Sequence, residues 1–254
     1  NKVVLDEFSN ELAQYGNLGS PGQNAVTMVR VKVGDKLGNI YGPVFQGVNA
    51  DGSPQFEDVN NDGTLNTDSG NVLQDDYDGR VLGTAYPTLE MSWSNVLEFG
   101  DGWTLNAFFR GAFGHSLINT FRAFYEPNVP SQTSYNQMNT SLREPNLAVA
   151  QYSSLYVEKA DFFLLDNLTL SKQIFFPEGS GIKDLTVSLN ALRPFVITSY
   201  TGTDPSPELF DALGGGEEGV EAGSDGAALL APGIDRRQDY FASKTFSIGL
   251  SVNF

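Results

Sequence analysis

Apolar and polar residues alternate over the last ten positions of the chain, from Thr245 to Phe254. The apolar positions share one parity, and they are Phe246, Ile248, Leu250, Val252 and Phe254. Because successive side chains of a β-strand point to opposite faces, a period of two predicts a strand with one apolar and one polar face. Such a strand fits two architectures: a half-buried strand of a soluble sandwich, or a membrane strand with lipid on one side and a polar lumen on the other.

Residues 89–99 and 103–113 alternate in the same way on either side of a short Gly-Asp-Gly segment. This arrangement predicts a hairpin with a minimal turn. Both arms are longer than the usual five or six residues of a soluble strand. The apolar face of the hairpin carries no charge, and Trp93, Phe99 and Trp103 on it could form an aromatic girdle at a membrane interface.

Three further segments extend the pattern. Residues 184–191 alternate regularly, and residues 26–33 alternate valine with Arg30 and Lys32. Residues 156–172 alternate less regularly, and we expect a β-bulge near Asp166 to shift the register there. About six strands are therefore predicted, fewer than the roughly eight that close a barrel. Since every backbone group in hydrocarbon must be paired, the strands must pair with more protein, from the same polypeptide or from other chains.

The connections between the predicted strands differ in length in an ordered way. The links at residues 100–102 and 175–183 are short, whereas residues 34–85, 115–153 and 201–238 are long and rich in Gly, Pro, Asn and Asp. Outer-membrane barrels have short periplasmic turns and long extracellular loops. The sequence therefore predicts an all-β fold, part of a transmembrane antiparallel β-barrel with long extracellular loops.

Composition excludes several classes of function. The net charge of -16 argues against a nucleic-acid binder, which must neutralise phosphates. The chain has no cysteine and one histidine, His115, which we expect to be structural, so no catalytic constellation is evident and no enzyme is predicted. The longest apolar runs, residues 162–165 and 227–231, are too short for a membrane-spanning helix. No export signal follows Asn1, as expected for a mature chain or a fragment.

Residues 58–66 match the first half of a calcium loop of the D-x-[DN]-x-[DN]-G type. Its candidate ligands are Asp58, Asn60, Asp62, Thr64, Asn66 and Asp68. Oxygen ligands at alternate positions suit a hard cation, and Gly63 permits the sharp turn. The twelfth position is Ser69 instead of an acid, so an acidic turn closed by its own side chains is the alternative. A bound calcium ion would make the loop rigid, and no other cofactor is expected.

Two more groups in the long connections are candidate sites. The aromatic residues Phe121, Phe124 and Tyr125 could stack on a substrate, cover a partner protein or form a small satellite core. Glu217 and Glu218 lie between glycines that provide no preorganisation, so we expect a solvated loop there and not a catalytic pair.

Several segments form a distinctive set when they are taken in order. They are the stretch from Val33 to Gly42, Asp58 to Gly63, Arg80 to Gly83 followed by Tyr86-Pro87, Tyr156 to Phe162, Asn167 to Leu170, Tyr200 to Pro205 and the strand that ends at Phe254. Together they resemble the late barrel region of the SusC/RagA family of TonB-linked outer-membrane transporters, over nearly the whole chain. The chain departs from the family pattern at Leu164, Asp166 and Ser171, and in the spacing of acidic residues 75–78.

The resemblance implies a barrel of about 22 strands with a plugged lumen. Residues 1–254 would supply the C-terminal portion of that barrel, without the N-terminal plug. The implied partners are the remainder of the barrel and plug, TonB through the absent N-terminal region, outer-membrane lipid and a SusD-like surface lipoprotein that caps the barrel. The implied function is active import of oligosaccharides or peptides across the outer membrane of a Gram-negative bacterium, with a periplasmic C-terminus at Phe254.

Polar residues on the predicted strands are candidates to face the lumen: Glu90, Ser92, Glu98, Asn106, Arg110 and Asn190. The alternative function is a soluble, secreted, carbohydrate-binding β-sandwich in which residues 58–68 form a structural calcium loop. A third interpretation, an adhesin or secretion-associated barrel, differs in lacking a lid partner.

Overall fold

The computed structural model describes residues 4–7, 12–19, 23, 26–68, 72–129, 138–206, 209, 230–237 and 241–254. The chain folds into two compact units, and it passes between them five times. The first, here called the loop unit, contains Asn1–Thr88, Gly114–Ala160 and Tyr200–Tyr240. The second, here called the sheet unit, contains Leu89–Phe113, Asp161–Ser199 and Phe241–Phe254. Within the described residues, no helix has both the length and the apolar character to cross a bilayer.

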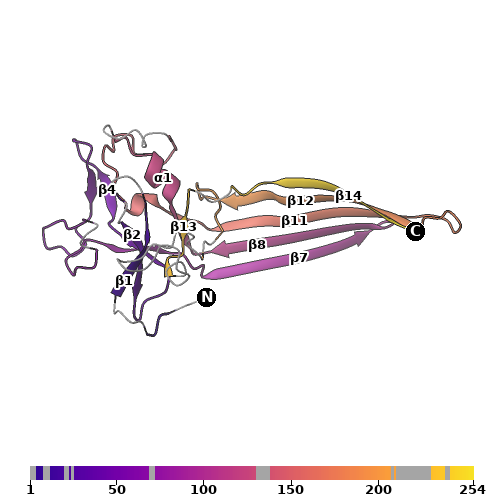
Figure 1. Cartoon of the computed structure of the whole chain (residues 1–254), viewed down its shortest axis with the longest axis horizontal. Coiled ribbons are helices and arrows are strands. Elements are labelled where there is room, and N and C mark those ends of the chain that lie inside the picture. Colours follow the sequence, from indigo (N-terminus) through magenta and orange to yellow (C-terminus); the bar gives the residue numbers. More distant parts are fainter. Residues whose placement is uncertain are drawn as a thin grey trace. The chain divides into compact units, whose positions relative to one another are not determined.

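The sheet unit is one five-stranded antiparallel sheet (Figure 1). Its strands, in their order across the sheet, are β14 (Thr245–Asn253), β12 (Asp184–Thr198), β11 (Phe162–Phe175), β8 (Trp103–Phe113) and β7 (Leu89–Phe99). The predicted hairpin is β7 and β8, joined at residues 100–102, and the register pairs Leu89 with Phe113. The strand predicted at residues 184–191 is part of β12, which continues to Thr198. The strand predicted at residues 156–172 corresponds to β11 only from Phe162 onward, because Val157–Lys159 form a separate strand of the loop unit.

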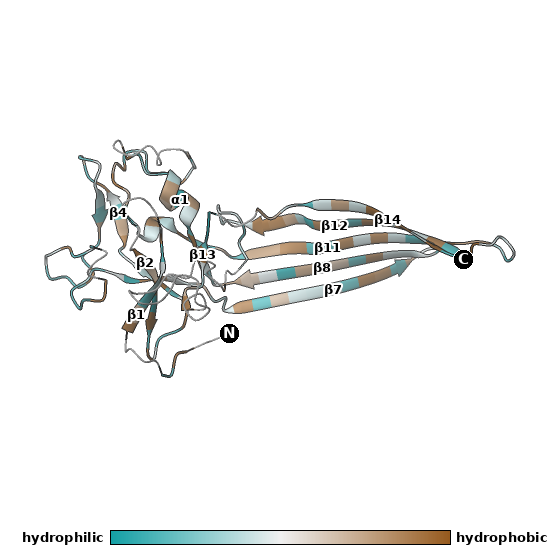
Figure 2. Cartoon of the chain, in the orientation of Figure 1, coloured by the Kyte–Doolittle hydropathy of each residue, from teal (hydrophilic) through white to brown (hydrophobic). Residues whose placement is uncertain are grey.

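The two faces of this sheet differ in polarity, and Figure 2 shows apolar and polar bands alternating along its strands. The strand register aligns the apolar positions of neighbouring strands on one face, for example Leu105 with Leu170 and Leu189. This apolar face is exposed: Ile248 and Leu250 are 74% and 71% solvent-accessible. Among the described residues of the sheet unit, no second sheet covers it. The sandwich alternative required such a cover, so the all-β membrane-barrel prediction is the one the structure supports.

A β-bulge interrupts β11 between Leu165 and Asn167, as predicted. The bulge carries Asp166, whose carboxylate forms an ion pair with Arg110, at 2.8 Å from Nε to Oδ2. Because the bulge inverts the parity of the strand, Phe162 and Leu164 lie on the opposite face from Leu168 and Leu170. This change of face is the register shift that the sequence predicted near Asp166. Phe162 and Leu164 are buried in a small cluster with Ala112 and Val196.

The lengths of the strands fit a membrane. The strands β7 and β8 have 11 residues each. At about 3.4 Å per residue and a tilt of about 40°, such a strand crosses roughly 25 Å, the height of the apolar band of outer-membrane barrels.

The described residues of the loop unit form smaller sheets, a short helix and a 3-10 turn. A four-stranded sheet has the order β1 (Leu12–Asn17), β2 (Thr27–Lys32), β3 (Asn39–Gly42) and β6 (Arg80–Thr84). A three-stranded sheet has the order β10 (Val157–Lys159), β9 (Ser116–Asn119) and β13 (Ile234–Asp235), and β4 (Phe45–Val48) pairs with β5 (Pro54–Phe56). Helical elements among the described residues include α1 (Thr120–Tyr125) and the 3-10 turn η2 (Ser154–Tyr156).

The strand predicted at residues 26–33 exists as β2, but it pairs with β1 and β3 in the loop unit. The sheet unit therefore has five strands, and the expected sixth was assigned to the wrong sheet. Period-two alternation could not reveal this, because a strand buried in a loop unit and a strand in a barrel wall produce the same pattern. The core of the loop unit includes Met28, Val29, Ile40 and Ile118, all of them fully buried.

Candidate functional site

The polar face of the sheet unit is the first candidate surface. Paired residues of neighbouring strands point to the same face of a sheet, and the strand register places all six predicted lumen-facing residues on this face. Asn106 pairs with Thr169, which in turn pairs with Asn190. On β7 and β8, Ser92 pairs with Arg110, and Glu90 pairs with Ala112. Hydrogen bonds connect the face across strands: the Thr169 hydroxyl donates to Asn190 Oδ1 at 2.8 Å. This face combines hydroxyl, amide and charged groups, such as those of Thr169, Asn190 and Arg110.

Aromatic rings form rows on the apolar face. Trp93 stacks on Phe109 with ring centroids 5.4 Å apart, and Phe109 stacks on Phe163 at 5.6 Å. Nearer the tight turn, Phe99 and Trp103 stack at 6.4 Å. These rows contain the three aromatic residues that the sequence predicted for an interfacial girdle, and their positions on the apolar face agree with that prediction.

A buried ionic network organises the loop unit around Arg122 on α1. Its Nε lies 3.0 Å from both carboxylate oxygens of Glu126, and its Nη1 lies 3.0 Å from Glu158. Further guanidinium N–H groups donate to the carbonyl oxygens of Leu155 and Leu142. Burial alone would lower the pKa of Arg122, but the hydrogen bonds and charges of Glu126 and then Glu158 outweigh it, so the pKa of Arg122 is raised. The guanidinium therefore stays charged and holds the helix against two other segments.

A second buried carboxylate, Asp235 on β13, anchors the segment that follows residue 199. Its Oδ2 accepts from the Tyr200 hydroxyl at 2.6 Å and from the Thr203 backbone N–H at 2.9 Å. The Thr201 N–H donates to Glu158 Oε2 at 3.0 Å. Sequence reasoning missed Arg122, Glu158 and Asp235, although Glu158 and Tyr200 lie within two of the segments that carry the family resemblance.

The calcium-like loop is closed by its own side chains. Asp58 Oδ2 accepts from the Gly63 N–H at 2.9 Å, and Asn60 Oδ1 accepts from the Asp62 N–H at 2.9 Å. Asp78, which is not one of the predicted ligands, is fully buried and accepts from the Val59 N–H at 2.8 Å through Oδ1. In the described part of the chain, no three Asp, Glu or His side chains converge as a metal group. The bonds match the metal-free alternative, while calcium binding by oxygen ligands of Asp58, Asn60, Asp62, Thr64, Asn66 and Asp68 stays a prediction.

The predicted aromatic cluster lies on α1. Phe124 is buried beneath the guanidinium of Arg237, at 3.5 Å from its ring centroid, and makes an edge contact with Tyr125 at 4.9 Å. Phe121 and Tyr125 are half-buried, and their ring centroids lie 6.3 Å apart. Phe124 therefore has a packing role, and Phe121 and Tyr125 stay candidates for substrate contact.

The two other sequence candidates are His115 and the pair of residues 217 and 218. His115 is buried, and its Nε2 lies 2.9 Å from the carbonyl oxygen of Pro205, which agrees with a structural role. Glu217 and Glu218 lie outside the described residues.

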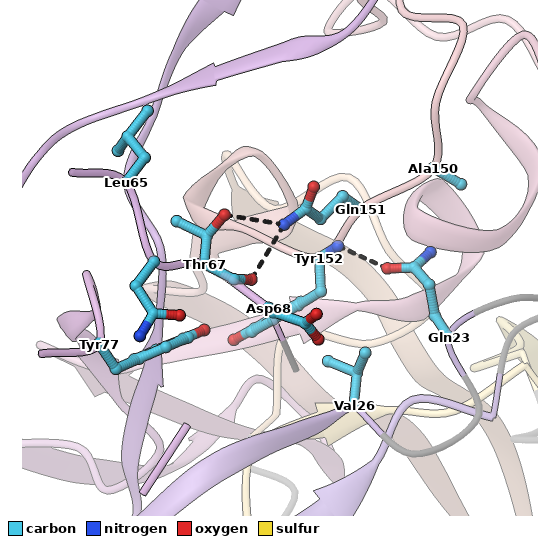
Figure 3. A pocket seen from close by; sticks show the side chains of 10 residues that line it. Gln23, Val26, Leu65, Thr67, Asp68, Tyr77, Ala150, Gln151 and Tyr152 are labelled. Carbon is cyan, nitrogen blue, oxygen red and sulfur yellow. Dashed lines mark hydrogen bonds between the residues drawn. The ribbon is translucent and has the colours of Figure 1, made fainter. Parts of the chain in front are cut away.

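The loop unit also contains a pocket of about 550 Å³ (Figure 3). Its lining includes Gln23, Val26, Leu65, Asn66, Thr67, Asp68, Tyr77, Ala150, Gln151 and Tyr152. Two hydrogen bonds join its walls: Gln151 Nε2 donates to the Thr67 carbonyl oxygen at 3.1 Å, and the Tyr152 N–H donates to Gln23 Oε1 at 2.6 Å. Burial raises the pKa of both Tyr77 and Tyr152, so both phenols are neutral at physiological pH.

A long-stranded sheet with one exposed apolar face and one polar face is the architecture of a segment of a transmembrane β-barrel wall. Comparison with protein-family models found no match, and comparison with curated proteins found none. Solved structures that match the fold include the RagAB peptide importer in its "closed-closed" state (TM-score 0.62, 18% identity), the RagAB peptide transporter (0.62, 19%) and the importer in its "open-open" state (0.59, 18%). They cover 100%, 97% and 100% of this chain.

The chain spans about a quarter of the length of these solved chains, at 26%, 25% and 25%. At this identity the likeness concerns the fold. The resemblance to the SusC/RagA family is confirmed in that respect: this chain has the fold of a part of a RagA-type barrel protein.

Proposed function

We propose that this chain is the C-terminal wall and loop region of an outer-membrane active importer that takes up oligosaccharides or peptides. In this proposal the energy is relayed through TonB to a plug outside this chain, and a SusD-like surface lipoprotein acts as a lid. The solved chains that share the fold belong to a peptide importer, which supports transport over catalysis. No catalytic step is proposed.

The exposed apolar face is the observation that carries the proposal. Its side chains on β14, from Phe246 to Leu250, are about three-quarters exposed in the chain alone. An apolar patch of this extent needs a cover. Hydrocarbon is the cover that fits, because the strands have the length of a membrane crossing and the opposite face is polar.

The two outer strands, β7 and β14, end the sheet within the described residues. Open strand edges are not stable in hydrocarbon. The rest of the barrel is therefore the proposed partner for both edges, with outer-membrane lipid around them.

The ends of the sheet suggest its orientation. Leu89 pairs with Phe113, and Phe162 pairs with both Ala112 and Thr198. The start of β7, the end of β8, the start of β11 and the end of β12 therefore lie at the same end of the sheet, and each of them leads along the chain to the loop unit. The opposite end has the tight turn at residues 100–102, the link at residues 176–183 and Phe254. By the rule that short turns are periplasmic, we assign the C-terminus to the periplasm and the loop unit's segments to the extracellular side.

The test is made with the full-length protein in its native organism. We expect it to fractionate with outer membranes, to require detergent, to copurify with a SusD-like lipoprotein, and to lose uptake when TonB is depleted. Stable, monodisperse protein in buffer without detergent would overturn the membrane assignment. A barrel without a lipoprotein partner and without TonB dependence would favour the adhesin or secretion alternative.

A further inference from the structure

We infer that Lys172 and Trp103 form a binding site for the phosphate group of an anionic phospholipid, on the apolar face of the sheet unit near its short-turn end. The inference rests on the part of the proposed function that assigns this face to the membrane, and it is independent of the imported substrate. Both residues belong to the sheet unit.

One charged side chain, that of Lys172, stands among the apolar residues of this face. The register pairs Lys172 with Trp103 on β8 and with Val187 on β12, and paired residues point to the same face. The positions two residues before and after it on β11 are Leu170 and Ile174. At the other paired positions of this face in the described strands, the side chains are uncharged. A lysine that faces hydrocarbon is unfavourable, and it is tolerated where its ammonium group reaches the membrane interface.

The sheet itself provides no negative charge for Lys172. Its strand, β11, is the central one, with β8 and β7 on one side and β12 and β14 on the other. Any further strand of a barrel would begin three strands away from β11, at about 14 Å. Within the described residues, no carboxylate forms an ion pair with Lys172. Asp184 at this end of the sheet lies on the opposite face, where the Gln173 side chain donates to it. The counter-charge therefore has to come from outside the sheet.

The geometry of the site is fixed by the turn that precedes Trp103. The Trp103 ring stacks on Phe99 with centroids 6.4 Å apart and planes 6° apart, and the Lys172 ammonium lies 5.5 Å from the centroid of the Trp103 ring. The turn is held against β11, since the Gln173 N–H donates to the carbonyl oxygen of Gly102 at 2.8 Å. This is the end of the sheet at which the C-terminus lies (Figure 1). In the proposed orientation it meets the periplasmic leaflet.

A lipid phosphate suits the donors of this site. The Lys172 ammonium has three N–H donors and no acceptor, and the indole N–H of Trp103 is also a donor only. Trp103 is 38% exposed, so a ligand can reach it. Phosphate groups of lipids lie at the depth of an interfacial aromatic belt and attract nearby lysines when the headgroup is anionic. Phosphatidylcholine carries its own cation beside the phosphate, so we expect the site to prefer phosphatidylglycerol.

Lys172→Gln is the decisive variant, because it removes the charge and keeps a long side chain. It breaks no ion pair within the described residues, so the melting temperature in detergent should stay unchanged or rise. We expect the variant to bind phosphatidylglycerol about fivefold more weakly, the effect of one lysine beside an anionic lipid. Lys172→Arg keeps the cation and should keep the binding.

Lys159→Gln is the matched control. Lys159 is an exposed lysine on β10 in the loop unit, so its substitution makes the same change of net charge away from the apolar face. We expect this variant to bind phosphatidylglycerol with the affinity of the wild type.

The assay is native mass spectrometry of the full-length protein in a maltoside detergent, which contains no phosphate. The protein is titrated separately with phosphatidylglycerol, phosphatidylcholine and inorganic phosphate. Preferential binding of phosphatidylglycerol, weakened in Lys172→Gln and kept in Lys172→Arg and Lys159→Gln, supports the inference. Equal binding by Lys172→Gln and the wild type, equal affinity for the two lipids, or equally tight binding of inorganic phosphate alone overturns it.

Fractionation separates this inference from the proposed function. If the full-length protein sediments with outer membranes and requires detergent while Lys172→Gln binds phosphatidylglycerol as the wild type does, the membrane assignment stands and the lipid site fails. If the protein is stable and monodisperse without detergent, the membrane assignment fails and the lipid site fails with it.

Discussion

Two variants, each with a single arginine at one of two adjacent positions of β14, test the membrane assignment most directly. Ile248 lies on the apolar face and Ser247 on the polar face, and the register pairs them with Leu189 and Asn190. Both side chains are exposed in the chain alone. The two variants, Ile248→Arg and Ser247→Arg, thus introduce the same charge at nearly the same depth, on opposite sides of the wall.

The expected magnitude follows from the depth of the residue. Ile248 is five positions from Asn253 at the short-turn end of β14, which at about 3.4 Å per residue and a tilt of about 40° is roughly 13 Å, half of the apolar band. Arginine facing lipid at that depth costs about 2–4 kcal/mol, a decrease of roughly 30- to 1,000-fold in the folding equilibrium. Val252→Arg, one position from the same end, should cost only about 0–1 kcal/mol.

The assay is denaturant unfolding of the full-length protein in lipid vesicles, followed by the fluorescence of its tryptophans. Ile248→Arg should lower the midpoint, and Ser247→Arg should leave it near that of the wild type. Equal costs at the two positions, or a larger cost at Ser247, would refute the assignment of the apolar face to lipid.

Three further predictions concern the loop unit. Arg122→Ala should destabilise the loop unit by about 3–5 kcal/mol, because Glu126 and Glu158 would remain buried without their cation. Arg80→Ala, which breaks the exposed ion pair with Glu57, should cost less than about 1 kcal/mol. Thermal unfolding compares the two variants, and similar losses of stability would contradict the argument. If the loop from residue 58 to residue 68 binds calcium, terbium luminescence should be sensitised in the wild type and lost in a variant with both Asp58→Asn and Asp62→Asn; no signal in the wild type would favour the acidic turn. Burial raises the pKa of Tyr77 and Tyr152 above the unfolded value of about 10. The contribution of these neutral phenols to folding stability is therefore complete below that pH and is lost as the pH rises above it. The absorbance of tyrosinate should show phenols that ionise only when the protein unfolds, and ionisation of every tyrosine before unfolding would contradict this prediction.

Much of the sheet unit could be predicted because strand geometry is local. The hairpin at residues 89–113 and the strand at residue 245 onward follow from the alternation of side chains across a pleated backbone, which needs no knowledge of neighbours. The bulge at Asp166 was predictable for the same reason, since a charged residue on the apolar parity conflicts with the pattern. The sequence did not reveal on which side of the bulge the apolar residues lie on the exposed face, because that depends on the register with β8 and β12.

The loop unit was predictable only in part. The calcium-like motif located the turn at Gly63, but its closure depends on Asp78, which is 20 residues beyond Asp58 and adjacent to it only in the folded chain. The aromatic residues of α1 were identified, but which of them packs inward depends on Arg237, a contact across more than 100 residues. Periodicity and composition carry no information about such long-range pairs.

The sequence by itself determined the all-β class, the tight turn at Gly100 to Gly102 and the separation of apolar from polar positions on β7, β8, β12 and β14, because each depends on backbone geometry repeated every two residues. Tertiary structure alone decided that β2 belongs to the loop unit, that Arg122 meets Glu158, and that Gln23 meets the backbone of Tyr152. The physical reason is the same in all three cases: side chains far apart in the chain meet only through the pairing and packing of whole segments, and the cost of burying their polar groups is set by that environment.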